Sequence, residues 1–154
     1  MNHLEELERL IQEYVAFAST LKKESLVQKM FMDRRSNDSD HPAHMAFYDA
    51  VGQWASDFAA SEPCQQELVT ALNRLLLTAR NYKNHMAYWY LLVIQGHAAN
   101  LIPLLEDGNR QHLLEAFEDH YPSREQLPVQ KNISGLLRGE KPAKKKKFLS
   151  FLNP

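Results

Sequence analysis

The chain has 154 residues, of which 44% are hydrophobic and 24% charged, so it has the size and composition of one globular domain and not of a disordered chain, a collagen-like repeat or a polytopic membrane protein. Five glycines and seven prolines are few for a β-sandwich or barrel, which need many turns. The formal charge of −1 is unevenly spread: residues 1–137 hold 12 basic and 18 acidic residues, and residues 138–154 hold six basic residues and one acidic residue. An acidic body is a poor platform for a polyanion, so we expect no nucleic-acid partner.

The first predicted element is an amphipathic helix from residue 4 to about residue 32. Its apolar residues recur at steps of three and four, as in Leu4, Leu7, Ile11 and Tyr14. Asn2 and Glu5 have the spacing of a capping box at its start. The apolar stripe can pack inside the protein's own bundle or against a second copy. Because the stripe is wider than a two-stranded zipper, we expect a monomer or a weak dimer.

Residues 33–41 contain no apolar side chain, which predicts a solvated loop before the second helix. That helix is expected from Pro42, and its inner face comprises Phe47, Val51, Trp54 and Phe58. Ser61, followed by Glu62 and Pro63, has the pattern of a cap at the start of a third helix. The inner face of this third helix comprises Leu68, Leu72, Leu75, Leu76 and Ala79.

The fourth predicted helix is the most apolar part of the chain. Nine consecutive residues from Met86 to Ile94 are hydrophobic, and no acidic residue, lysine or arginine occurs up to Leu105. A helix that is apolar all round must be surrounded, and this stretch of twenty residues is long enough to span a bilayer. Its second half, however, contains polar or helix-breaking residues, namely Gln95, Gly96, His97, Asn100 and Pro103. We therefore predict a central core helix in preference to a membrane span.

Two shorter helices complete the predicted set. One begins near Asn109, after the turn at Asp107 and Gly108, and buries Leu113, Leu114 and Phe117. The other follows Ser123, which has Gln126 at the capping-box position, and its buried residues are expected to be Val129, Ile133, Leu136 and Leu137.

These elements predict an all-α fold, a compact bundle of about six helices around the apolar fourth one. The alternative is a short helical-repeat array, because Pro63 and Pro103 have the spacing of paired-helix repeats. The sequences after these prolines do not resemble each other, which favours the bundle. We assign residues 1–138 to the bundle and residues 139–154 to a basic and apolar tail.

A cluster of histidines and carboxylates precedes and begins the second helix: Asp38, Asp40, His41, His44 and Tyr48. At helical spacing Asp40, His41 and His44 are candidate metal ligands, which makes a metal-dependent enzyme one hypothesis. A catalytic zinc site needs three protein ligands and an open position, and the sequence has no Glu-x-x-His or His-Glu-x-x-His motif. We favour a capped helix start with solvent-exposed histidines and no metal or other cofactor.

The polar side chains of the fourth helix are a second candidate site. Gln95, His97 and Asn100, together with Trp89, either bond to neighbouring helices or line a ligand pocket between them. Nearby side chains of similar character are His85, Tyr88 and Tyr90. Side chains satisfied by neighbouring helices are the commoner arrangement and the one we expect.

The single cysteine, Cys64, lies near a predicted helix N-terminus, where the helix dipole can lower the pKa of a thiol. No histidine lies within a few residues of it to act as a base, so we expect an inert thiol. One cysteine cannot form an internal disulfide, and residues 1–6 lack the basic and apolar pattern of a signal peptide. Both observations predict a cytoplasmic protein.

The tail joins a basic block to an apolar one. The basic block is Lys144, Lys145, Lys146 and Lys147, and the apolar residues are Phe148, Leu149, Phe151 and Leu152. Such a segment docks on the acidic body, binds an anionic membrane surface, or remains a solvated end. We favour docking, because opposite charges on one chain are present at high effective concentration.

No catalytic residue can be assigned from the sequence. It contains no phosphate-binding glycine loop, no Gly-x-Ser-x-Gly motif and no basic helix-turn-helix. The leading hypothesis is a small, non-catalytic helical module that binds a protein partner. The alternatives are a metal-dependent enzyme and a protein held at a membrane surface by its tail.

Overall fold

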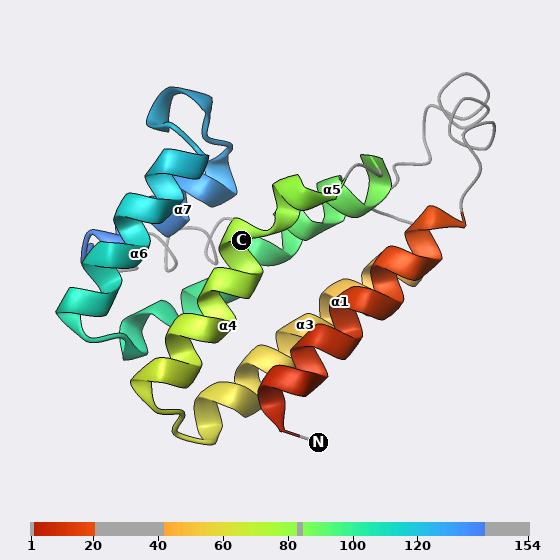
Figure 1. Ribbon diagram of the computed structural model, residues 1–154, viewed down its shortest axis with the longest axis horizontal. Coiled ribbons are helices and arrows are strands. Elements are labelled where there is room, and N and C mark those ends of the chain that lie inside the picture. The colour runs from red at the N-terminus through yellow and green to blue at the C-terminus, as the bar shows by residue number, and fades with distance from the viewer. Residues whose placement is uncertain (1, 21–41, 83–84, 141–154) are drawn as a thin grey trace, which may run out of the picture.

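The computed structural model describes residues 2–20, 42–82 and 85–140, and in these ranges the chain is helical with no β-strand (Figure 1). The α-helices are α1 (His3–Ser19), α3 (Pro42–Ala60), α4 (Gln65–Leu77), α5 (His85–Val93), α6 (Asp107–His120) and α7 (Pro128–Leu137). Short 3₁₀-helices connect them: η2 (Ala79–Asn81), η3 (Ile94–Asn100), η4 (Ile102–Leu104) and η5 (Ser123–Glu125). The predicted all-α bundle is confirmed.

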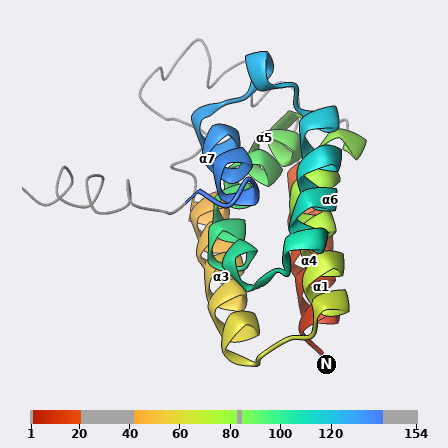
Figure 2. The ribbon, with the colours of Figure 1, turned by 90° about the vertical axis from the view of Figure 1, so that its left-hand side faces the viewer.

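The helices pack in two layers around one core. α1, α4 and α6 lie on one side of the bundle, and α3 and α7 lie on the other (Figure 2). α1 packs against α3 and α4, α6 packs against α4 and α7, and η3 lies among α3, α4 and α7. The core is continuous across both layers, and its largest fully buried side chains include Phe58, Leu72, Ile94, Phe117 and Ile133.

α1 begins as its sequence predicts. The Glu5 amide donates to Asn2 Oδ1 at 2.8 Å, and the Asn2 amide donates to the Glu5 carboxylate, which completes the capping box. Leu7, Ile11 and Tyr14 are buried in the protein's own core, whereas Leu4 is only half-buried. The predicted continuation of this helix to residue 32 and the predicted loop 33–41 lie outside the described residues.

α3 begins at Pro42 as expected, and the four apolar residues predicted for its inner face are all buried. The predicted cap of the next helix is wrong. The Ser61 hydroxyl donates to the Phe58 carbonyl at 2.6 Å and so completes the end of α3. The chain turns between the two helices at Glu62, which has a positive φ of 54°, and Cys64, two residues later, is the N-cap of α4. All five side chains predicted for the inner face of α4 and its C-terminal end are buried.

The single long helix predicted from Met86 to Leu105 is not present as such. The α-helix ends at Val93 and is followed by η3 and η4, where a glycine and a proline lie at positions 96 and 103. The expected burial all round α5 is also wrong at Trp89, which is 45% exposed. η3 is the segment at the centre of the bundle, since it contacts α3, α4 and α7. In the described parts of the chain no helix has the length and apolarity to cross a membrane.

The last two helices occur in the predicted order with shifted starts. α6 begins at Asp107, two residues before the predicted start, and its three predicted core residues are buried. Ser123 begins η5 instead of capping α7, and Leu127 is the N-cap of α7. The Leu127 amide donates to Gln130 Oε1 at 3.0 Å. Val129, predicted to be buried, is half-buried.

Candidate functional site

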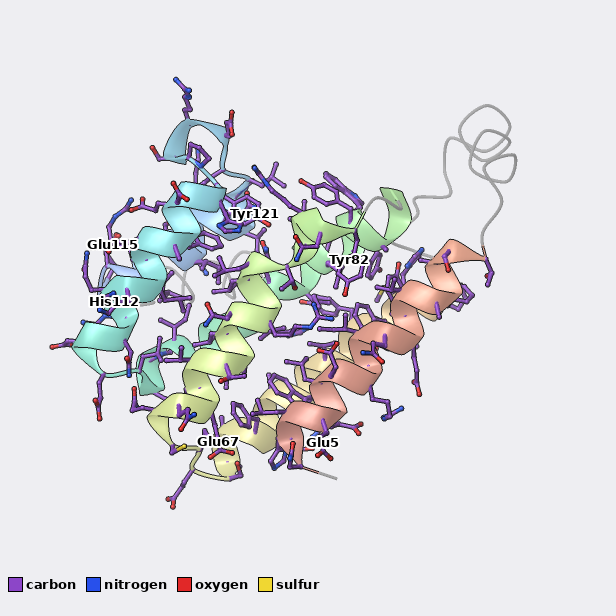
Figure 3. All side chains as sticks on the ribbon, in the orientation of Figure 1. Glu5, Glu67, Tyr82, His112, Glu115 and Tyr121 are labelled. Atoms are coloured by element: carbon purple, nitrogen blue, oxygen red, sulfur yellow. The ribbon has the colours of Figure 1, made fainter. Side chains whose placement is uncertain are left out.

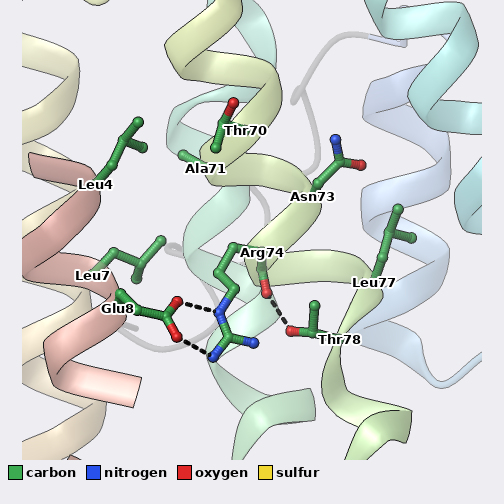
Figure 4. Close-up of a pocket in the computed structure, with 9 residues that line it drawn as sticks. All are labelled: Leu4, Leu7, Glu8, Thr70, Ala71, Asn73, Arg74, Leu77 and Thr78. Atoms are coloured by element: carbon green, nitrogen blue, oxygen red, sulfur yellow. Dashed lines mark hydrogen bonds and ion pairs between the residues drawn. The ribbon is translucent and has the colours of Figure 1, made fainter. Parts of the chain in front are cut away.

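A groove of about 400 Å³ lies between α1 and α4 on the outer face of the bundle (Figure 4). The residues that line it lie on one face of each helix. The lining residues are Leu4, Leu7 and Glu8 from α1, and Thr70, Ala71, Asn73, Arg74, Leu77 and Thr78 from α4 and its C-cap. Leu4 and Leu77 are half-buried, so the groove retains apolar surface that the core does not cover.

An ion pair between Glu8 and Arg74 lies across this groove (Figure 4). Arg74 Nε is 2.6 Å from Glu8 Oε2, and Arg74 Nη2 is 2.9 Å from Glu8 Oε1, so the contact is bidentate. The same Nη2 donates to the Tyr82 hydroxyl at 2.8 Å, and the guanidinium lies 5.8 Å from the centre of the Tyr82 ring. The hydrogen bond from Arg74 lowers the pKa of Glu8, despite the opposing effect of partial burial. The pair therefore bridges α1 and α4 across a groove whose other polar side chains, Thr70, Asn73 and Thr78, are uncharged.

The two ends of the groove differ in charge. Glu5 and Glu67 lie at the N-terminal ends of α1 and α4, at the same end of the bundle, and Tyr82 lies beyond the C-terminal end of α4 (Figure 3). The Cys64 side chain and its amide, 3.2 Å from Glu67 Oε1, lower the pKa of Glu67 by hydrogen bonding, and His3 lowers it further by its charge. Two carboxylates thus lie at one end of the two helices, and the Glu8–Arg74 pair lies farther along both of them.

The candidate metal ligands are only partly described. His44 is fully buried, its Nδ1 is hydrogen-bonded to the Tyr14 hydroxyl, and its ring stacks on Tyr90 with centroids 4.1 Å apart. The expectation of solvent-exposed histidines is therefore wrong for His44, because Tyr14 of α1 and Tyr90 of α5 pack their rings against it. Asp38, Asp40 and His41 lie outside the described residues. No group of three metal-binding side chains occurs in residues 2–20, 42–82 and 85–140.

Tyr48 contacts His97 of η3, not the candidate ligand His44. His97 Nε2 donates to the Tyr48 carbonyl at 3.0 Å, and the two rings lie 4.3 Å apart. Burial lowers the pKa of His97. Gly52 makes room for this ring, since a Cβ there would lie 2.8 Å from His97 Cε1.

Gln95 is fully buried and bonded to its neighbours, as the favoured interpretation expects. Its Nε2 donates to the Leu76 carbonyl at 3.2 Å and to the Tyr121 hydroxyl at 3.3 Å, and its Oε1 accepts from Gln130 at 3.4 Å. Leu76 is in the last turn of α4, so Gln95 satisfies a carbonyl that the helix leaves without an internal partner. Asn100 and Trp89 are exposed. Neither these two residues nor Gln95 and His97 line the groove between α1 and α4.

Cys64 is exposed at the N-cap of α4. The other predicted interaction residues, Lys144 to Lys147 with Phe148, Leu149, Phe151 and Leu152, lie outside the described residues.

The groove and its ion pair are not predicted by the sequence pattern. One signal was available, because Arg74 interrupts the apolar run of α4 and Glu8 directly follows Leu7 in α1. The two residues are 66 positions apart, and only the parallel packing of α1 and α4 shows that they pair.

Comparisons of the chain with protein-family models, with curated protein sequences and with solved structures give no match. The chemistry of the groove is therefore the basis on which a function can be proposed.

Proposed function

We propose that the protein is a non-catalytic helical module that binds another protein through the groove between α1 and α4. The observation that carries the proposal is the uncovered apolar surface of Leu4 and Leu77 beside a fixed ion pair. An apolar groove between two helices accommodates side chains of a partner segment, and recognition of this kind needs no reacting groups.

The charges around the groove favour a basic partner. α1 carries Glu5, Glu6, Glu8 and Glu13 against Arg9 alone, and Glu67 adds a further carboxylate at the N-terminal end of α4. Arg9 bonds to both Glu6 and Glu13, and Arg74 bonds to Glu8, so the carboxylates among these that no arginine of the described residues pairs with are Glu5 and Glu67. A segment that combines lysines with a few apolar side chains complements this surface.

The proposal is tested with two fluorescent peptides of about fourteen residues. One has leucines at positions i, i+3, i+4 and i+7 with lysine elsewhere, and the other has glutamate in place of lysine. We expect the lysine peptide to bind the full chain, and binding to weaken with added salt. We expect Leu77→Asp to reduce this binding at least tenfold, because the charge lies on the groove wall.

Leu127→Asp is the control, since Leu127 is an exposed leucine outside the groove, at the N-cap of α7, where an aspartate is well tolerated. Circular dichroism of both variants establishes that they are folded. Equal binding of the two peptides, or equal binding by the Leu77 and Leu127 variants, would contradict the proposal.

Absence of catalysis, a monomeric or weakly dimeric state and a cytoplasmic location are part of the same proposal. Metal analysis of the full chain without a histidine tag separates it from the metal-enzyme hypothesis. Stoichiometric zinc, iron or manganese that is lost on His44→Ala would favour the enzyme, provided that the variant remains folded.

A further inference from the structure

The basic residues of this chain are segregated from its described body. Residues 2–20, 42–82 and 85–140 contain 15 acidic and 7 basic residues, a formal charge of −8, against −1 for the whole chain. Five of the remaining basic residues belong to the tail that follows Glu140, namely Lys141, Lys144, Lys145, Lys146 and Lys147. The described body is therefore strongly acidic, and the lysines of the tail supply part of the positive charge that balances it.

The described chain ends beside the first turn of α6. Gly139 lies beside Arg110 of α6, since a Cβ on this glycine would be 3.5 Å from Arg110 Nη2. The neighbouring Asn109 donates to Gln65 Oε1 at 3.0 Å, and Gln65 is the first residue of α4. The tail thus follows a residue that lies beside the first turn of α6, and that turn contacts the first residue of α4.

This edge of the molecule is lined with carboxylates. They are Glu5 on α1, Glu62 in the turn before α4, Glu67 in the first turn of α4, and Glu106 and Asp107 at the start of α6. All of them are exposed except Glu67, which is half-buried. We call these five residues the acidic edge.

We propose that residues 144–152 of the tail occupy the groove between α1 and α4 of the same molecule, with the lysines on the acidic edge and the apolar side chains on Leu4 and Leu77. This inference rests on the proposed function, because it makes the tail an intramolecular competitor of the protein partner. Phe148, Leu149, Phe151 and Leu152 supply the apolar chemistry that the groove accepts.

The lengths agree with this placement. Phe148 is nine residues beyond Gly139, a reach of about 30 Å for extended chain, which exceeds the roughly 20 Å of two helix–helix spacings between the near side of α6 and the far side of α4. The groove wall from Thr70 to Thr78 is about 12 Å long at the helical rise of 1.5 Å per residue. Residues 148–152 span about 13 Å when extended, so the apolar block matches the length of the apolar surface.

The first test uses Cys64, the single cysteine of the chain, which is exposed at the N-terminal end of α4. A nitroxide attached there broadens the NMR signals of nearby amides. We expect broadening of residues 144–152 in the full chain, and recovery of these signals in the full-chain variant Phe148→Ser/Phe151→Ser. Ser150→Ala is the matched control and is expected to keep the broadening. Sharp tail signals in the parent would overturn the inference.

The second test measures competition with a fluorescent peptide of residues 141–154 added in trans. A tethered segment has an effective concentration on the order of 1 mM, so a peptide that binds the empty groove at about 50 µM should bind the parent about 20-fold more weakly than the Phe148→Ser/Phe151→Ser chain. Equal binding to parent and variant would overturn the inference and leave the proposed function intact. No binding of this peptide or of the lysine peptide to either chain would overturn both.

The membrane alternative is separated in the same set of experiments. Vesicles of equal parts phosphatidylcholine and phosphatidylserine should not retain the parent chain, because its apolar tail residues are already covered. Salt-sensitive co-sedimentation of the parent, together with sharp tail signals in solution, would overturn groove docking in favour of a membrane-surface anchor.

Discussion

Replacing Gln95 by leucine tests the polar network at the centre of the bundle. The change keeps the side-chain size but removes three hydrogen bonds, so the Leu76 carbonyl, the Tyr121 hydroxyl and the Gln130 amide each lose a buried partner. A buried polar group without a partner costs about 1–3 kcal/mol, and we use the lower end because these bonds are 3.2–3.4 Å long. Three such losses, less about 1 kcal/mol for the added apolar surface, give a net destabilisation of about 2 kcal/mol.

For a domain of this size, this value corresponds to a fall in Tm of about 4–8 °C. Urea unfolding followed by far-ultraviolet circular dichroism measures the free energy of unfolding directly, since the described fold is helical. Gln53→Leu is the matched control, because Gln53 is exposed and its hydrogen bond within the described residues is to Asp57 on its own helix. We expect it to change stability by less than about 0.5 kcal/mol. A Gln95→Leu variant as stable as the parent would refute the assignment of a stabilising role to the network.

Three further predictions concern His97, Gly52 and Glu8. Burial lowers the pKa of His97 in the folded state. Its contribution to stability is therefore complete above the unfolded-state pKa near 6.5 and is lost as the pH falls through the folded-state pKa. His97→Gln should flatten the profile of unfolding free energy measured between pH 7.5 and 5. Gly52→Ala should cost about 1–2 kcal/mol by displacing the ring of His97, and a smaller cost in a His97→Ala background would identify this contact as the cause in a double-mutant cycle. The hydrogen bond from Arg74 lowers the pKa of Glu8, so the contribution of Glu8 to stability is present above about pH 4.5 and is lost as the pH falls through its folded-state pKa. Thermal melts of Glu8→Gln should lack this acid-sensitive component. An unchanged dependence of Tm on acid pH would contradict the role assigned to the Glu8–Arg74 pair.

Periodicity was sufficient to predict most of the core. Apart from the half-buried Leu4, the described residues predicted for the inner faces of α1, α3 and α4 are buried, because an amphipathic helix buries one stripe and the spacing of apolar residues defines it. Helix ends were predicted less well. Ser61 and Ser123 have the side chain of an N-cap, yet Ser61 completes α3 and Ser123 begins η5. A hydroxyl serves either end of a helix, and the sequence alone does not indicate which.

The site depended on contacts that a single sequence does not contain. The absence of charges predicts burial of α5 and η3. Neither this absence nor the periodicity of α1 shows which apolar residues remain at the surface, such as Trp89 and the half-buried Leu4. The absence of charges also does not distinguish a polar side chain that lines a pocket from one that bonds to a neighbouring helix. Gln95 belongs to the second kind because Leu76, Tyr121 and Gln130 converge on it from three other segments.

The central position of η3 has a consequence for how the domain folds. A run of seven residues in a 3₁₀-helix is longer than such helices usually persist, because their hydrogen bonds have poorer geometry than those of an α-helix. η3 therefore depends on α3, α4 and α7 for its conformation, and we expect it to form after these helices have assembled. Its amides should exchange with solvent only through global unfolding, and φ-values at Ile94 and Ala98 should be low. The middle of this molecule is then the last part of it to become ordered.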